Sequence, residues 1–175
     1  MGINRIYFLL LTLFFVACGN DAAVPEPQTV VAPMYDEAAV SVNQEIVRRE
    51  HADIALVAKR YGWNLTQTQT GLYYEILNNK KGNCPQTKDV VQIKGKIYLQ
   101  DGTEIYNDKT DGVKQFTVNR SDDPIGLHEL VKLMREGEKS CAIIPAYLAY
   151  GISGKGGEIP ALAFLICEIE LVKIN

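Results

Sequence analysis

The end of the chain constrains the fold most, because apolar and polar side chains alternate along residues 161–173. Five apolar residues fall on one side of this segment: Ala163, Leu165, Cys167, Ile169 and Leu171. Glu168 and Glu170 fall on the opposite side, near the end of the segment. Successive side chains of a β-strand point to opposite faces of a sheet. A period of two therefore predicts a strand with one apolar face.

Shorter segments of the same kind precede it from Gly71 onward. We predict strands at residues 72–77, 91–99, 115–118 and 139–144, in addition to the final strand. The sequence Gln100-Asp101-Gly102-Thr103 after the second of these is a strong hairpin signal. A short helix is predicted at residues 127–134, with Leu127, Leu130, Val131 and Met134 on one side. An antiparallel sheet wrapped around this helix accounts for the order, so the sequence predicts an α+β domain over residues 70–175.

A longer helix is predicted ahead of this domain, at residues 37–61. Its apolar residues recur at helical spacing and form one stripe: Val40, Val47, Ile54, Ala58 and Tyr61, widened by Ile46 and Val57. Gly62 follows as a helix stop, and residues 37–65 make up this N-terminal unit. The stripe either packs on the body of the protein or serves as a dimer contact or a clamp for client proteins. Asn43 and Glu50 interrupt a coiled-coil seam, which favours packing or partner contact.

The first residues are typical of an export signal rather than of a folded domain. Arg5 supplies a positive start, and residues 6–16 form an apolar run that is too short to span a bilayer, which needs about 20 residues. We interpret residues 1–17 as a signal peptide. The residues that lead into Cys18 resemble a bacterial lipoprotein box, which predicts lipidation of Cys18; the alternative is a secretory peptide with an incidental cysteine. Residues 18–36 are rich in proline and predict an extended tether.

Apart from Cys18, three cysteines and two histidines follow the signal peptide. Cys141 and Cys167 fall in strand-like segments and are predicted to be small buried apolar residues; a bridge between them is the alternative, and Cys84 is left over. His51 and His128 are isolated and are expected at the surface. No cysteine–histidine spacing indicates a metal site. A net charge of −3 gives no electrostatic footprint for nucleic acid.

Two motifs near the C-terminus carry a resemblance to a known family. Pro145-Ala-Tyr-Leu-Ala-Tyr-Gly151 is followed by a glycine-rich loop, by Ile159-Pro160 and by the final strand. This order resembles the signature of the FKBP-type peptidyl-prolyl isomerases. The resemblance covers about residues 70–175 and includes five more segments in order: Gly71–Leu77, Asp89–Gly95, Asp101-Gly102, Gly126-Leu127 and Met134–Glu138. With its lipidated start and N-terminal helix, the whole chain resembles the gliding-associated lipoprotein FKBPs.

The resemblance implies a pocket of apolar and aromatic side chains with a tyrosine hydroxyl as hydrogen-bond donor. It assigns Tyr150 as the catalytic tyrosine. The substrate-binding positions it implies are Ile93, Ile105, Tyr106, Phe116, Leu127, Ile159 and Cys167. Amide resonance gives rotation about a peptide bond a barrier of about 18–20 kcal/mol, and a pocket that binds the twisted amide better than either planar form lowers it. The reaction needs no nucleophile, metal ion or cofactor, and none is predicted.

Several of these positions depart from the family pattern. Ile93 stands where a tyrosine is usual, the pair Ile105-Tyr106 replaces phenylalanine and aspartate, and Leu127 replaces the tryptophan of the pocket floor. Cys167 replaces a phenylalanine, and Lys114 takes a common aromatic position. Pro124 falls at or near the residue whose backbone N–H binds the ligand, and proline has no N–H. The pocket is expected to stay apolar but to lose stacking area and one donor.

The sequence therefore leaves two functions open. The first is a peptidyl-prolyl isomerase, with activity reduced by the pocket substitutions, that assists the folding of proline-containing exported or unfolded proteins. The second is a non-catalytic FKBP-fold chaperone or assembly subunit of an envelope or secretion complex. In both cases we expect a lipid-anchored protein of the bacterial cell envelope, attached through Cys18, facing the periplasm and more consistent with the outer membrane. An envelope-complex partner belongs to the second function.

Overall fold

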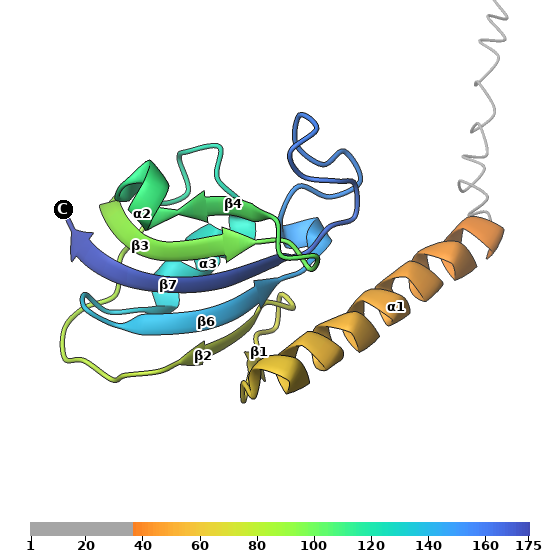
Figure 1. Cartoon of the computed structure of the whole chain (residues 1–175), viewed down its shortest axis with the longest axis horizontal. Coiled ribbons are helices and arrows are strands. Elements are labelled where there is room, and N and C mark those ends of the chain that lie inside the picture. Colours follow the sequence, from red (N-terminus) through yellow and green to blue (C-terminus); the bar gives the residue numbers. More distant parts are fainter. Residues whose placement is uncertain (1–36) are drawn as a thin grey trace, which may run out of the picture. The chain divides into compact units, whose positions relative to one another are not determined.

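The computed structural model describes residues 37–175, and their side chains from residue 40 onward (Figure 1). Residues 37–175 form one compact unit. The signal peptide predicted at residues 1–17, the tether at 18–36 and the lipidation site at Cys18 lie outside the described residues.

The described part of the chain forms a seven-stranded antiparallel sheet with order β1-β2-β6-β7-β3-β4, and β5 also pairs with β3. The strands are β1 Thr66–Gln67, β2 Tyr73–Ile76, β3 Val90–Tyr98, β4 Glu104–Asn107, β5 Lys114–Thr117, β6 Lys139–Ile144 and β7 Leu165–Ile174. The helices are α1 Glu37–Tyr61, α2 Asp108–Asp111, α3 Ile125–Leu133 and the 3₁₀ turn η1 Ala146–Leu148. The predicted α+β fold is confirmed; β1, α2 and η1 were not predicted, and of β4 only the hairpin turn that precedes it was.

One face of the sheet and helix α3 enclose the main core. The predicted apolar side of β7 lies in this core, with Leu165, Cys167, Ile169 and Leu171 all buried. Helix α3 approaches β6 closely because it carries Gly126: a Cβ at that position would lie 2.3 Å from Ile144 Cγ2. The alternating pattern of the final strand therefore identified the covered face correctly.

Helix α1 covers part of the opposite face of the sheet. Ile54 and Val57 are buried there in a second cluster with Tyr98, Ile143, Phe164 and Ile166. The helix ends at Tyr61, and Gly62 follows with a φ of +69°, as the sequence predicted. Packing is confirmed for Ile54 and Val57 and in part for Ala58, whereas Val40, Val47 and Tyr61 remain 42%, 43% and 44% exposed.

The cysteines among the described residues, Cys84, Cys141 and Cys167, are free thiols, and the two strand cysteines are buried as predicted. Cys167 lies in the main core, as does Ala142, the residue opposite it in the neighbouring strand β6. Cys141 pairs instead with Glu168 and lies 3.8 Å from a carboxylate oxygen of Glu75. Neighbouring strand residues alternate between faces, so the two thiols lie on opposite sides of the sheet and cannot form a bridge.

Candidate active site

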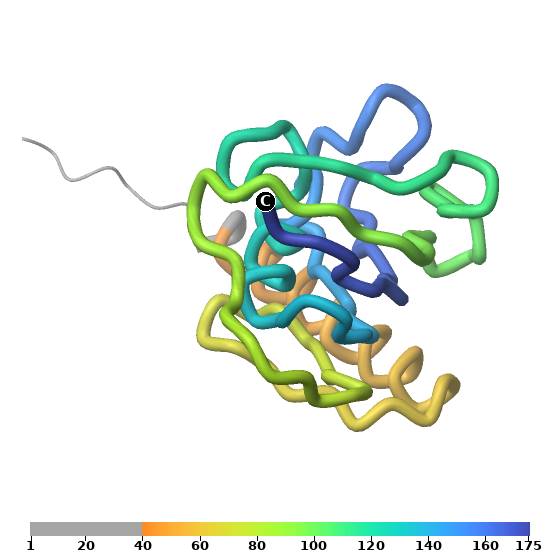
Figure 2. The backbone as a smooth tube through the Cα atoms, turned by 90° about the vertical axis from the view of Figure 1, so that its left-hand side faces the viewer, coloured from red at the N-terminus to blue at the C-terminus, as the bar shows by residue number. Residues whose placement is uncertain are grey.

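The loop that carries Tyr150 begins directly where β6 ends. Pro145 follows Ile144 and starts the 3₁₀ turn η1, whose residues Ala146 and Leu148 are buried. The N–H of Gly151 then donates to the carbonyl of Ala146 at 2.8 Å, with Gly151 at a φ of +58°. Glycine adopts this left-handed angle without strain. The segment between η1 and β7 then projects from one end of the sheet (Figures 1 and 2).

The ring of Tyr150 is half-buried against the main core, while its hydroxyl makes no hydrogen bond to any described residue. Burial raises the pKa of this hydroxyl above its ordinary value; the negative charge of Asp123 raises it further, and the ammonium of Lys114 opposes the effect. The phenol therefore stays protonated at neutral pH. Tyr150 presents a free O–H donor beside an apolar surface.

An ion pair lies beside this tyrosine. Lys114 Nζ is 2.7 Å from a carboxylate oxygen of Asp123, and both side chains are mostly buried. Lys155 Nζ lies over the Tyr150 ring, 5.4 Å from its centroid. The sequence identified Lys114 only as a departure from the family, at a position that is commonly aromatic. Its pairing with Asp123, 9 positions away, was not predicted.

Phe116 of β5 forms a buried wall, and its ring meets the edge of His128 with centroids 5.3 Å apart. The prediction that His128 lies at the surface is wrong, because its side chain is buried in helix α3. Its Nδ1 accepts from the N–H of Asn119 at 3.2 Å, and Nε2 lies 3.3 Å from the carbonyl of Ser121. Two backbone groups therefore satisfy the ring nitrogens, which removes the usual penalty for burying them. His51 is exposed, as predicted.

Tyr106 uses its hydroxyl inside the protein. It donates to the carbonyl of Gly112 at 2.8 Å and accepts from the N–H of Lys114 at 3.1 Å. The carbonyl of Ile93 also lies 3.2 Å away. Tyr106 takes the position where the family has an aspartate. Its hydroxyl thus holds the segment between β4 and β5 in place.

The remaining predicted pocket residues differ in how much surface they offer. Ile93, Leu127 and Cys167 are fully buried and Ile159 is nearly so, while Ile105 is half-buried. Burial also raises the pKa of the Cys167 thiol to about 12, so that this side chain remains a neutral, apolar group. All eight predicted site residues belong to, or pack on, one core cluster. Tyr150 and Ile105 are the more accessible of these eight residues. The fully buried Ile93, Leu127 and Cys167 support them from beneath.

Ile159 is held by a tight hairpin. Its carbonyl accepts from the N–H of Lys155 at 2.9 Å, and its own N–H donates back to Lys155 at 3.1 Å. Gly154, with a φ of +61°, is required here because a Cβ would lie 2.2 Å from the carbonyl oxygen of Ile159. The described residues contain no group of histidine, cysteine, aspartate and glutamate side chains that could hold a metal ion. The site offers one hydrogen-bond donor and apolar surface.

Comparison with known proteins places this chain in a family. The model of the family described as FKBP-type peptidyl-prolyl cis-trans isomerase matches residues 81–172. The macrophage infectivity potentiator of Trypanosoma cruzi is 27% identical over 173 residues, which cover 98% of this chain and 84% of that protein. The FKBP-type 22 kDa peptidyl-prolyl cis-trans isomerase of Escherichia coli K12 is 35% identical over 118 residues, 67% of this chain and 55% of that protein.

Solved structures agree with this assignment. The crystal structure of FkpA from Escherichia coli superposes with a TM-score of 0.64 and 28% identity, covering 79% of this chain and 64% of that one. A peptidyl-prolyl cis-trans isomerase structure from Pseudomonas syringae shares the fold with a TM-score of 0.63 and 22% identity, covering 75% of this chain and 95% of that one. The family match, the Escherichia coli relatives and the Tyr150 loop together show that this chain belongs to the FKBP-type peptidyl-prolyl cis-trans isomerase family.

Proposed function

We propose that this protein catalyses cis-trans isomerisation of the peptide bond before proline in exported or unfolded proteins. The bond before proline is a tertiary amide whose cis form is only slightly disfavoured, and its uncatalysed exchange takes about tens to hundreds of seconds. Apolar walls lower the barrier by taking the prolyl ring and its amide out of water, because water hydrogen-bonds to the planar, charge-separated amide and stabilises it. The chain needs no reactive group for this step.

The observation that carries the proposal is the free hydroxyl of Tyr150. Its ring is held by the core and by the η1 turn, and its O–H has no partner among the described residues. A substrate carbonyl next to the proline can accept this hydrogen bond. Tyr150 would then fix the peptide while Ile105, Phe116 and Ile159 surround the prolyl ring, supported from below by Ile93, Leu127 and Cys167, with Tyr106 at the edge.

We infer that the activity is low for the family. Leucine at position 127 and cysteine at 167 leave less aromatic surface, and both side chains are fully buried. Pro124 begins helix α3 as its N-cap residue and has no N–H to offer a ligand. The replacement of the family's tryptophan, phenylalanine and aspartate also favours the second candidate function, a non-catalytic chaperone or assembly subunit that uses the fold to bind one partner of the envelope.

We also propose that the chain is a lipoprotein of the gliding-associated type, with a signal peptide at 1–17, a tether at 18–36 and its FKBP domain at 70–175. Lipidated Cys18 would anchor it in the bacterial envelope facing the periplasm, with the outer membrane favoured. Acyl chains hold a protein at a membrane without a spanning helix. Among the described helices, none is long and apolar enough to cross a bilayer.

The test is a protease-free isomerisation assay, in which the full chain is added to a protein whose refolding is limited by proline. We expect acceleration that falls about tenfold in Tyr150→Phe, because one hydrogen bond of about 1.4 kcal/mol is lost. Tyr61→Phe, a substitution of the same kind at an exposed tyrosine at the end of helix α1, is the control. A folded wild-type chain that does not accelerate refolding would exclude the enzyme and leave the binding function.

A further inference from the structure

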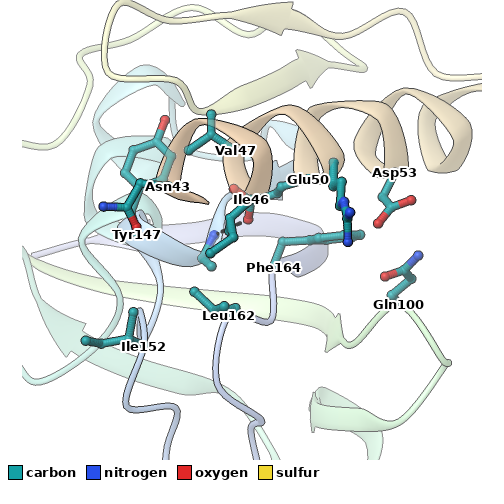
Figure 3. A pocket seen from close by; sticks show the side chains of 12 residues that line it. Asn43, Ile46, Val47, Glu50, Asp53, Gln100, Tyr147, Ile152, Leu162 and Phe164 are labelled. Carbon is teal, nitrogen blue, oxygen red and sulfur yellow. Dashed lines mark hydrogen bonds between the residues drawn. The ribbon is translucent and has the colours of Figure 1, made fainter. Parts of the chain in front are cut away.

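A cavity lies between helix α1 and the loop that joins η1 to β7. We call it the α1 cavity; its volume is about 390 Å³, a size typical of ligand sites. Ile46 and Val47 line it from the helix, and Tyr147, Ile152, Leu162 and Phe164 line it from the domain. Figure 3 shows Ile46 directed across the cavity toward Leu162 and Phe164. Two segments about 100 residues apart in the sequence therefore share one apolar space.

Large apolar side chains gather at this cavity with much of their surface exposed. Ile152 is 81% exposed, Tyr147 50%, Leu162 44% and Val47 43%. Single exposed apolar residues are ordinary, but several around one cavity indicate a binding surface. Leu162 also holds a φ of +58°, an angle that side chains other than glycine rarely adopt. The hydrogen bond from its N–H to the carbonyl of Gly151, 2.9 Å long, holds it there.

The polar lining fits a polypeptide better than a charged ligand. The carboxamides of Asn43 and Gln100 line the cavity and make no hydrogen bond to the described residues. Each has a donor and an acceptor, as a peptide group has. The charges of two other lining residues are already engaged: Arg49 pairs with Glu45 at 2.7 Å, and a carboxylate oxygen of Glu50 accepts from the N–H of Ala146 at 2.7 Å. Asp53 is the remaining charged lining residue.

The cavity shares two residues with the Tyr150 loop. Tyr147 lies three residues before Tyr150 and Ile152 two residues after it, and three residues of chain span at most about 11 Å. An extended polypeptide advances about 3.3 Å per residue. A substrate with its proline at Tyr150 therefore reaches the α1 cavity within about two to four residues.

We propose that the α1 cavity is a subsite for an uncharged, apolar segment of the substrate polypeptide, two to four residues from the proline. This inference rests on the proposed isomerase function and specifies its substrate class: unfolded chains with a large apolar residue near the proline. Helix α1 lies outside the family match at 81–172. Through this cavity it takes part in substrate selection.

The test compares two labelled peptides that contain one proline. One has leucine three residues away on both sides, and the other has serine there. Binding to the full chain is measured by fluorescence anisotropy, and isomerisation by exchange NMR. We expect the leucine peptide to bind about tenfold tighter, as burial of one such side chain allows. Val47→Asp and Ile152→Asp should remove this preference and leave exchange of the serine peptide unchanged.

Leu56→Asp is the matched control, because Leu56 is an exposed residue of α1 that does not line the cavity; it should keep the preference. Equal binding of both peptides by the wild type would overturn the proposal, and so would variants that lose both peptides equally. If the wild type prefers leucine but does not accelerate exchange, the subsite stands and the enzyme function fails. If sedimentation shows a dimer that Ile152→Asp dissociates, a second copy covers the cavity and the proposal is wrong.

Discussion

The buried carboxylate of Glu138 allows a quantitative test of the structure. Its side chain is fully buried between α3 and β6. One oxygen accepts from the N–H of Lys80 and the other from the N–H of Arg135, both at 2.8 Å, and the Arg135 guanidinium lies 3.5 Å away. Burial alone would raise the pKa of Glu138, but the two backbone donors and the Arg135 charge outweigh it, so the pKa is lowered from 4.5.

Glu138→Gln replaces one acceptor oxygen by an N–H₂ donor that faces a backbone N–H. A hydrogen bond to a charged group contributes about 1.5–3 kcal/mol, so we expect the free energy of unfolding at pH 7 to fall by about 2–4 kcal/mol. Because the pKa is lowered on folding, the stabilisation is present above pH 4.5 and is lost as the pH falls through the folded-state pKa. The protonated carboxyl then resembles the amide, and the difference between the two proteins shrinks.

The assay is urea unfolding of wild type and Glu138→Gln at pH 7 and at stepwise lower pH. Glu136→Gln is the control, since Glu136 is exposed and accepts one N–H, from Ile174, at 3.1 Å; its effect should stay near about 0.5 kcal/mol. A Glu138→Gln effect below that of Glu136→Gln, or one that is the same at pH 7 and below pH 4, would refute the reasoning.

Three further predictions concern packing and the site. Gly126→Ala should destabilise the protein by about 1–3 kcal/mol in urea unfolding, because the added methyl group would collide with Ile144. Gly102→Ala is the control without a clash, since a Cβ there meets open space. Its φ of +90° adds only the strain of the backbone angle. Ile54→Ala should cost about 2–5 kcal/mol, and a value near that of an exposed position would show that α1 does not pack on the sheet. The isomerase rate should be constant between pH 6 and pH 9, since the pKa of Tyr150 is raised; a fall across this range would mean that another group titrates.

The sequence predicted the local elements well because their signals are local. The start and end of α1, the turn after β3 and the covered face of β7 each follow from residue spacing over fewer than 25 positions. The same reasoning failed for His128, whose burial depends on carbonyl and N–H groups of a loop and on Phe116. Nothing in the spacing of a single histidine reports such partners.

The sequence predicted which of the candidate site residues lie close together but not how accessible each of them is. The family resemblance brought together residues from five elements, and the structure confirms that they meet in one cluster. The resemblance could not show that the hydroxyl of Tyr106 is hydrogen-bonded to the segment between β4 and β5, or that Lys114 pairs with Asp123. The α1 cavity was also out of reach, because its walls come from residues 43–53 and 146–164 together with Gln100, and no local pattern connects them.

The cover that α1 provides has a practical consequence for anyone who wishes to study the catalytic part alone. A fragment that starts at residue 81, where the family match begins, would lack both α1 and β2. Ile143 and Ile166 would lose the helix that buries them, and β6 would become an open edge without its partner strand. Open edges beside apolar surface pair with other chains. Such a fragment is expected to aggregate, whereas one that starts before Glu37 should remain monodisperse.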